Sequence, residues 1–90
     1  MLMGMNAKKA LALAAAAARV GQLSFTGHAL DEMDEANATE RDVERACMTA
    51  TRALSQPDNR WRLEGGCDCA GEGLTVCVAI THGVVVVTVF

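Results

Sequence analysis

The C-terminal residues 74–90, LTVCVAITHGVVVVTVF, consist of two β-branched runs on either side of the dipeptide His82-Gly83. Valine, isoleucine and threonine favour extended backbone, and Gly83 can adopt the positive φ that a two-residue hairpin loop needs. The stretch therefore predicts an antiparallel hairpin, with strands at about 74–81 and 84–90.

The register of this hairpin predicts which side chains share a face of the sheet. If His82 and Gly83 form the loop, Thr81 pairs with Val84, and side chains alternate outward from that pair. One face is expected to pack on helices and carries Val76, Val78, Ile80, Val85, Val87 and Val89. The other face carries Thr75, Cys77, Ala79, Thr81, Val84, Val86, Thr88 and Phe90. An exposed apolar strip made of Ala79, Val84, Val86 and Phe90 is typical of a surface that meets another protein.

A further strand is predicted at about 60–65, after the turn-forming residues of the segment SQPDNR. Trp61 and Leu63 alternate there with two arginines. If the two apolar side chains join the core, Arg60 and Arg62 point to the second face of the sheet. The sequence therefore predicts one dry face and one mixed face bearing two arginines.

Upstream of the strands, the sequence predicts three helices at about 6–20, 26–35 and 39–53. Their expected N-caps are Asn6, Thr26 and Thr39, and Asp42 completes a capping-box-like pair with Thr39. Val43, Ala46, Cys47, Ala50 and Ala53 recur at helical spacing and mark the buried face of the third helix. The resulting prediction is one α+β domain spanning residues 1–90, with N-terminal helices on one face of a three- to four-stranded antiparallel sheet.

Composition narrows the functional classes. Half of the 90 residues are apolar, which argues against disorder, and no apolar run reaches the roughly 18 residues of a membrane span. Eight Lys and Arg against eleven Asp and Glu give a net charge of −3, so contact with RNA requires a local basic patch. The four cysteines are unevenly spaced and are expected to be free thiols in a reducing cytoplasm.

The N-terminal stretch MNAKKALALAAAAARV, residues 5–20, has the outline of a secretory signal, with basic residues followed by an apolar run. Most of that run is alanine, which is weakly hydrophobic, and Arg19 follows it at once. The sequence therefore favours a retained helix and a cytoplasmic location, with secretion as the alternative.

The order of the motifs FTGHALDEM, ATERDVERA, RWRLEG, GEGLTVCVAI and VVVVTVF resembles domain-of-unknown-function family 4258. The likeness covers residues 23–90 and depends on the pair His28-Ala29, on Met33, on the pair Asp42-Val43 and on the final residues Thr88-Val89-Phe90. Glu32 and Ala36 stand where members often have arginine, Thr75 where they often have histidine, and Phe90 where they end in tyrosine.

The family is similar to the small toxin fold of the RelE, BrnT and MqsR ribonucleases, and its members are often encoded beside a zinc-finger antitoxin. The resemblance implies helices on one side of an antiparallel sheet and any function on the other side. It also implies a toxin-like domain that cleaves messenger RNA, with His28, Arg60 and Arg62 as the candidate catalytic residues. No cofactor is expected.

His28 has two further interpretations. Its place in the first turn of a helix, among apolar neighbours, favours a packing role that ties the helix start to the sheet. His28 and Glu32 are one helical turn apart and could bind a metal together, but two ligands do not form a stable site.

The segment CDC places Cys67 and Cys69 in a glycine-rich loop between strands. Zinc takes four ligands, and only Cys77 is expected nearby, so one chain lacks a ligand unless two loops meet in a homodimer. The alternatives are redox chemistry and a flexible loop without metal. Cys47 is expected to be a small core residue.

Two classes of function follow. The first is a toxin-like ribonuclease that acts on messenger RNA or at the ribosome and is silenced by an antitoxin. The second is a non-catalytic interaction module of the same fold, which binds a protein partner or a second copy of itself through the open face of the sheet. The acidic balance of the chain and the arginines replaced in the motifs favour the second class.

Overall fold

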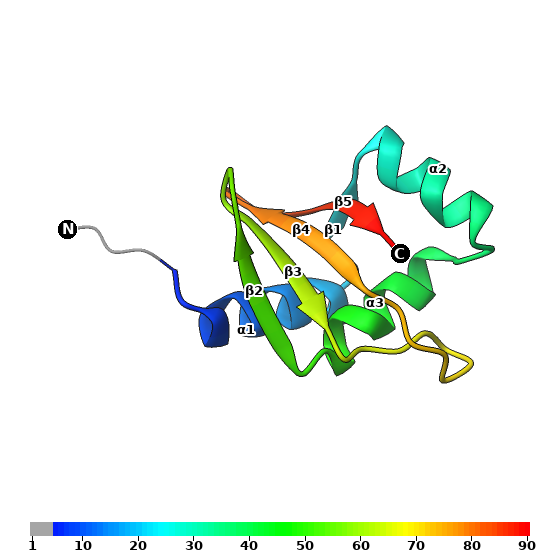
Figure 1. The fold of residues 1–90 in the computed structure, drawn as a ribbon, viewed down its shortest axis with the longest axis horizontal. Helices are drawn as coiled ribbons and strands as arrows, with labels where there is room; N and C mark the ends of the chain where they lie inside the picture. The colour runs from blue at the N-terminus through cyan, green and yellow to red at the C-terminus, as the bar shows by residue number, and fades with distance from the viewer. Residues whose placement is uncertain (1–4) are drawn as a thin grey trace.

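The computed structural model describes residues 5–90 and shows an α+β fold of three helices and five strands (Figure 1). In chain order the elements are α1 (Ala7–Arg19), β1 (Leu23–Phe25), α2 (Gly27–Glu35), α3 (Glu40–Thr49), β2 (Arg52–Gln56), β3 (Arg60–Glu64), β4 (Val76–Ile80) and β5 (Val84–Val89). The predicted fold class is confirmed. Among the described residues, no helix has the length and apolar character needed to cross a membrane.

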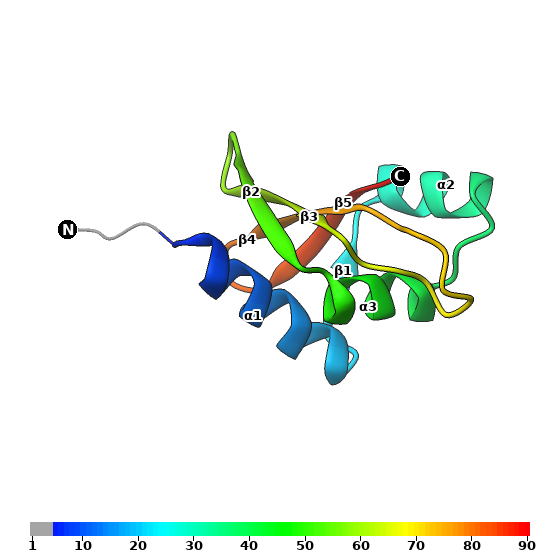
Figure 2. The same cartoon turned by 60° about the horizontal axis from the view of Figure 1, so that its bottom comes forward.

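The sheet is larger than predicted, with the strand order β1-β5-β4-β3-β2. Its three hairpin-type pairings are antiparallel, whereas β1 runs parallel to β5. Figure 2 shows α1 and α3 together beneath one face of the sheet, while α2 lies beyond the sheet near the end of β5. α1 and α3 therefore cover one face of the sheet, and α2 packs against β5 at the end of the sheet.

The two strands that the sequence did not predict are the edge strands. β1 has three residues, too few to show an alternating pattern. The first two residues of β2 were assigned to a helix predicted to reach residue 53, and this prediction was wrong because α3 ends at Thr49. Ala50 has extended torsion angles (φ −56°, ψ 141°), and the amide of Thr51 donates to the carbonyl of Glu64 on β3. Ala53 is buried as predicted, but from β2.

The predicted helix caps are confirmed. Asn6 accepts a hydrogen bond from the amide of Lys9, and Thr26 accepts one from Ala29. Thr39 and Asp42 exchange hydrogen bonds in a capping box at the start of α3. These side chains satisfy amides that the first turn of a helix leaves without a backbone partner.

The predicted hairpin register was wrong by one residue next to the loop. Ile80 pairs with Val84 across a three-residue loop, so Val84 and Val86 point into the core and are 5% and 0% exposed. Val85 points to the opposite face. Val87 is the extra residue of a β-bulge, which returns Val89 to the core.

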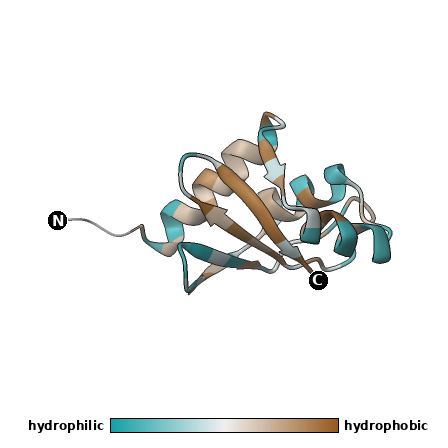
Figure 3. Cartoon of the chain, turned by 90° about the horizontal axis from the view of Figure 1, so that it is seen from above, coloured by the Kyte–Doolittle hydropathy of each residue, from teal (hydrophilic) through white to brown (hydrophobic). Residues whose placement is uncertain are grey.

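The core lies between the sheet and the pair α1 and α3. Ala10, Ala14 and Ala18 are buried on α1, and such small side chains let the helix lie close to α3. Leu63, Val43, Val76, Val78 and Val86 are the largest aliphatic side chains that are almost fully buried. Figure 3 shows β4 and β5 as the most hydrophobic elements, in contrast to the largely hydrophilic α2.

Candidate functional site

The face of the sheet that α1 and α3 leave uncovered is called the open face below. Along each strand, side chains point alternately to the two faces of the sheet. Trp61, Leu63, Val76 and Val78 are buried on the side of the helices, so the residues between them on β3 and β4, which are apolar or basic, lie on the open face. Its central residues are Leu54, Arg60, Arg62, Cys77, Ala79, Val85 and Phe90, none of which is fully buried. Arg60 and Arg62 thus lie on the face predicted for them.

Arg62 is held by two neighbours on this face. Its Nε lies 2.9 Å from Glu64 Oε2, and its guanidinium carbon lies 4.9 Å from the centre of the Phe90 ring. The Nε–H is nevertheless buried and not aligned for a hydrogen bond with the carboxylate. A guanidinium stacked on an aromatic face gains cation–π attraction. Arg62 therefore fixes the C-terminal residue against β3.

Glu64 also binds a second arginine. Its Oε1 accepts a hydrogen bond from Nε of Arg52 at 2.9 Å, and this hydrogen bond is the main reason why the pKa of Glu64 is lowered. Arg60 has no carboxylate partner among residues 5–90. Three guanidinium groups (Arg52, Arg60 and Arg62) and one carboxylate leave two positive charges on the open face, although the chain as a whole carries −3.

Cys77 lies beside the two arginines of β3, opposite Arg62 in the sheet register. Desolvation raises the pKa of its thiol, and the nearby charges of Arg60 and Arg62 only partly oppose this. A thiol with a raised pKa stays protonated at neutral pH and is a weak nucleophile. The open face therefore offers cations and apolar surface rather than a reactive group.

His28 lies in the first turn of α2, and its side chain is 67% exposed. Its Nε2 is 3.2 Å from Glu32 Oε2, and Glu32 Oε1 accepts a hydrogen bond from the amide of Val89 at 2.9 Å. Glu32 thus ties α2 to β5, as does Thr26, the N-cap of α2, whose amide donates to the carbonyl of Val86. The sequence interpretation had given this role to His28. Spacing alone indicated the His28–Glu32 pair, but nothing in the sequence indicated the contact with β5.

The three candidate catalytic residues lie on two separate elements of the fold. His28 is on α2, which packs on β5, whereas Arg60 and Arg62 are on β3, with β4 between β3 and β5. Adjacent strands are about 4.8 Å apart, so roughly 10 Å of sheet separates β5 from β3. Of the three, only the two arginines share one surface patch, and a joint role for His28 stays a prediction.

The loop that contains Cys67 and Cys69 is anchored to α3. The amide of Cys67 donates to Thr49 Oγ1 at 2.9 Å, and the amide of Cys69 donates to Asp42 Oδ1 at 3.0 Å. Asp68 accepts hydrogen bonds from the amides of Ala70 and Glu72 within the loop. Within residues 5–90, no three histidine, cysteine or acidic side chains are grouped as metal ligands. Hydrogen bonds thus hold the loop between β3 and β4 against α3.

Asp42 should make folding sensitive to acid. The amides of Thr39 and Cys69 lower its pKa from 3.8 to about 2. Because the folded-state pKa is depressed, Asp42 stabilises the fold above pH 4, and this contribution is lost as the pH falls towards 2. We expect the stability difference between the natural chain and an Asp42→Asn variant to shrink over that range. Urea unfolding at pH 6, 4 and 2.5 measures it, and a difference that stays constant would contradict the assignment.

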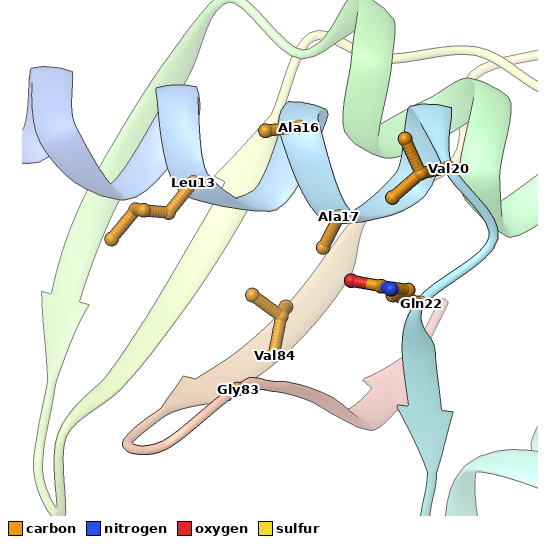
Figure 4. A pocket seen from close by; sticks show the side chains of 7 residues that line it. All are labelled: Leu13, Ala16, Ala17, Val20, Gln22, Gly83 and Val84. Atoms are coloured by element: carbon orange, nitrogen blue, oxygen red, sulfur yellow. The ribbon is translucent and has the colours of Figure 1, made fainter.

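A hollow of about 410 Å³ lies between α1 and the start of β5. Leu13, Ala17 and Val20 lie on one side of it, and Val84, Gly83 and Gln22 lie on the other (Figure 4). Gln22 supplies its only polar side chain, and no acid, base or nucleophile lines it. The hollow therefore offers apolar contact but no catalytic group.

Comparison with protein-family models, with curated proteins and with solved structures gave no match. The resemblance to family 4258 and to the RelE-like toxins therefore stays a prediction.

Proposed function

We propose that the chain is a protein-interaction module that binds a different protein through the open face of its sheet. The observation that carries this proposal is the mixture of side chains on that face. Val85, Ala79 and Cys77 form an apolar surface on the adjoining strands β5 and β4, and Phe90 follows directly after β5. Leu54 adds apolar surface on β2, on the other side of the two arginines of β3. Leu54 and Phe90 are 40% and 55% exposed, and their burial by a partner would be favourable.

The positive charge of the open face favours a partner other than a second copy of the chain. The open face carries two excess positive charges, so two copies stacked face to face would bring like charges together. A partner segment with acidic and apolar residues complements the same surface. Under the resemblance to family 4258, an antitoxin is the kind of protein that would supply such a segment.

A messenger-RNA ribonuclease is the second candidate, and the specific observation that favours it is Arg60 beside Arg62 on the uncovered face. Phosphoryl transfer needs groups that stabilise charge developing on phosphate, and arginines serve that role. Against it, Arg62 is already engaged by Glu64 and Phe90, and the thiol of Cys77 has a raised pKa.

Induced expression separates the two candidates. The interaction module is expected to leave growth and messenger RNA unchanged, whereas a ribonuclease arrests growth and cleaves RNA with or without ribosomes. An Arg60→Ala/Arg62→Ala variant should then be as harmless as the natural chain, and a Lys8→Ala/Lys9→Ala variant removes two exposed cations elsewhere as a control. Growth arrest that the first variant abolishes and the second retains would overturn the interaction proposal in favour of catalysis.

A further inference from the structure

A second basic site lies on the opposite side of the molecule, where the C-terminal end of α1 meets α3. A cleft of about 230 Å³ is lined there by Arg19, Arg41, Glu44, Arg45, Met48 and Cys69, with Ala18 at its base. Three of the eight basic residues of the chain thus surround one hollow of an acidic protein.

The three guanidinium groups lack a carboxylate partner among the residues that the structure describes. In residues 5–90, none of Arg19, Arg41 and Arg45 forms an ion pair or a side-chain hydrogen bond to a carboxylate. Arg41 and Arg45 are one turn apart on α3, a spacing at which like charges repel. Arg19, in the last turn of α1, adds a third positive charge from across the α1–α3 contact. An anion in the cleft would relieve this repulsion.

From this arrangement we infer that the cleft binds the phosphate group of a small phosphorylated molecule. Guanidinium groups present paired N–H donors that match phosphate oxygens, and the cleft is lined by three arginines against one carboxylate, Glu44. Asp42, which accepts a hydrogen bond from the amide of Cys69 beside the cleft, still leaves the arginines in excess. Ala18 and Met48 supply apolar surface for the remainder of the ligand. The volume suits one phosphate and a small attached group.

The surroundings of the cleft favour a small molecule over RNA. Glu40, Asp42 and Glu44 lie on the same helix as two of the arginines, so the positive potential is confined to the cleft. A nucleic acid strand would extend over these carboxylates, and its affinity would depend on several phosphates at once. The inference is independent of the open face, because the two sites share no residue.

Titration of the isotope-labelled chain followed by amide NMR tests the inference, with inorganic phosphate, adenosine 5′-monophosphate and a short oligouridylate as separate probes at constant ionic strength. Phosphate and the monophosphate are expected to give saturable shifts at Arg19, Arg41, Arg45 and Cys69. Arg41→Gln/Arg45→Gln should weaken binding at least about tenfold. Lys8→Gln/Lys9→Gln removes the same number of exposed charges at the other end of α1 and should bind as the natural chain does.

Three results would overturn the inference. The first is the absence of saturable shifts with either small probe, and the second is an equal loss of binding in both double variants. The third is tight binding of the oligouridylate alone, which would identify the cleft as a nucleic acid contact. Unchanged urea midpoints in the absence of ligand show that both variants are folded, so that a loss of binding reflects the site.

Discussion

Val86→Asp is expected to unfold the chain, whereas Val85→Asp, one residue earlier on the same strand, is expected to stay folded. Val86 is fully buried between β4 and β1, so its replacement places an unpaired carboxylate in the core. Such a charge destabilises a protein by about 3–5 kcal/mol, which is most of the stability of a domain this small.

Val85 is paired with Ala79 and Ser24 but points to the open face, where a carboxylate can reach water. Its replacement should cost only about 1 kcal/mol, through weaker β-sheet propensity. Circular dichroism during urea unfolding of the two variants measures the contrast. If Val85→Asp unfolded the chain and Val86→Asp did not, the hairpin would have the register predicted from the sequence instead of the observed one.

Gly66→Ala is expected to destabilise the fold by about 3 kcal/mol, the upper part of the range for an overpacked site. Gly66 is buried at the start of the loop that carries the two cysteines, and a Cβ there would overlap the carbonyl oxygen of Ala46. That oxygen accepts the hydrogen bond from Ala50 that completes the last turn of α3. The methyl group must therefore push the loop away from the helix.

Gly73 offers a matched control, because a Cβ at that position has open space around it and the residue belongs to the same loop. Gly73→Ala is expected to change the free energy of unfolding by less than about 0.5 kcal/mol. Thermal unfolding of both variants measures the difference. Equal midpoints for the two would contradict the close contact between the loop and α3.

Local chemistry explains which parts of the fold the sequence predicted. Asn6, Thr26 and Thr39 cap helices through hydrogen bonds to residues three positions away, and the alternation of Trp61 and Leu63 with the arginines needs no distant information. The register of β5 could not be predicted in this way. Residues 84–87 are all valine, so the hydrophobic pattern is the same for both faces.

The remaining features depend on contacts between distant residues. Leu23, Ser24 and Phe25 form β1 through parallel pairing with β5, about 60 positions later in the sequence. The hydrogen bond between Glu32 and Val89 likewise joins residues 57 positions apart. The basic cleft likewise combines Arg19 with arginines more than twenty positions away. Each residue was visible in the sequence, but their proximity is a property of the tertiary structure.

The proposal that the open face binds another protein is tested most directly by photo-cross-linking in the cell of origin. A benzophenone amino acid would replace Leu54 on the open face and, as the control, Lys9 on α1. We predict one protein adduct from position 54 and none from position 9. The cross-linked segment should contain acidic and apolar residues, and Arg60→Glu should weaken binding of the purified partner at least about tenfold. Adducts to RNA, a dimer of the chain itself, or the same adducts from both positions would contradict the proposal.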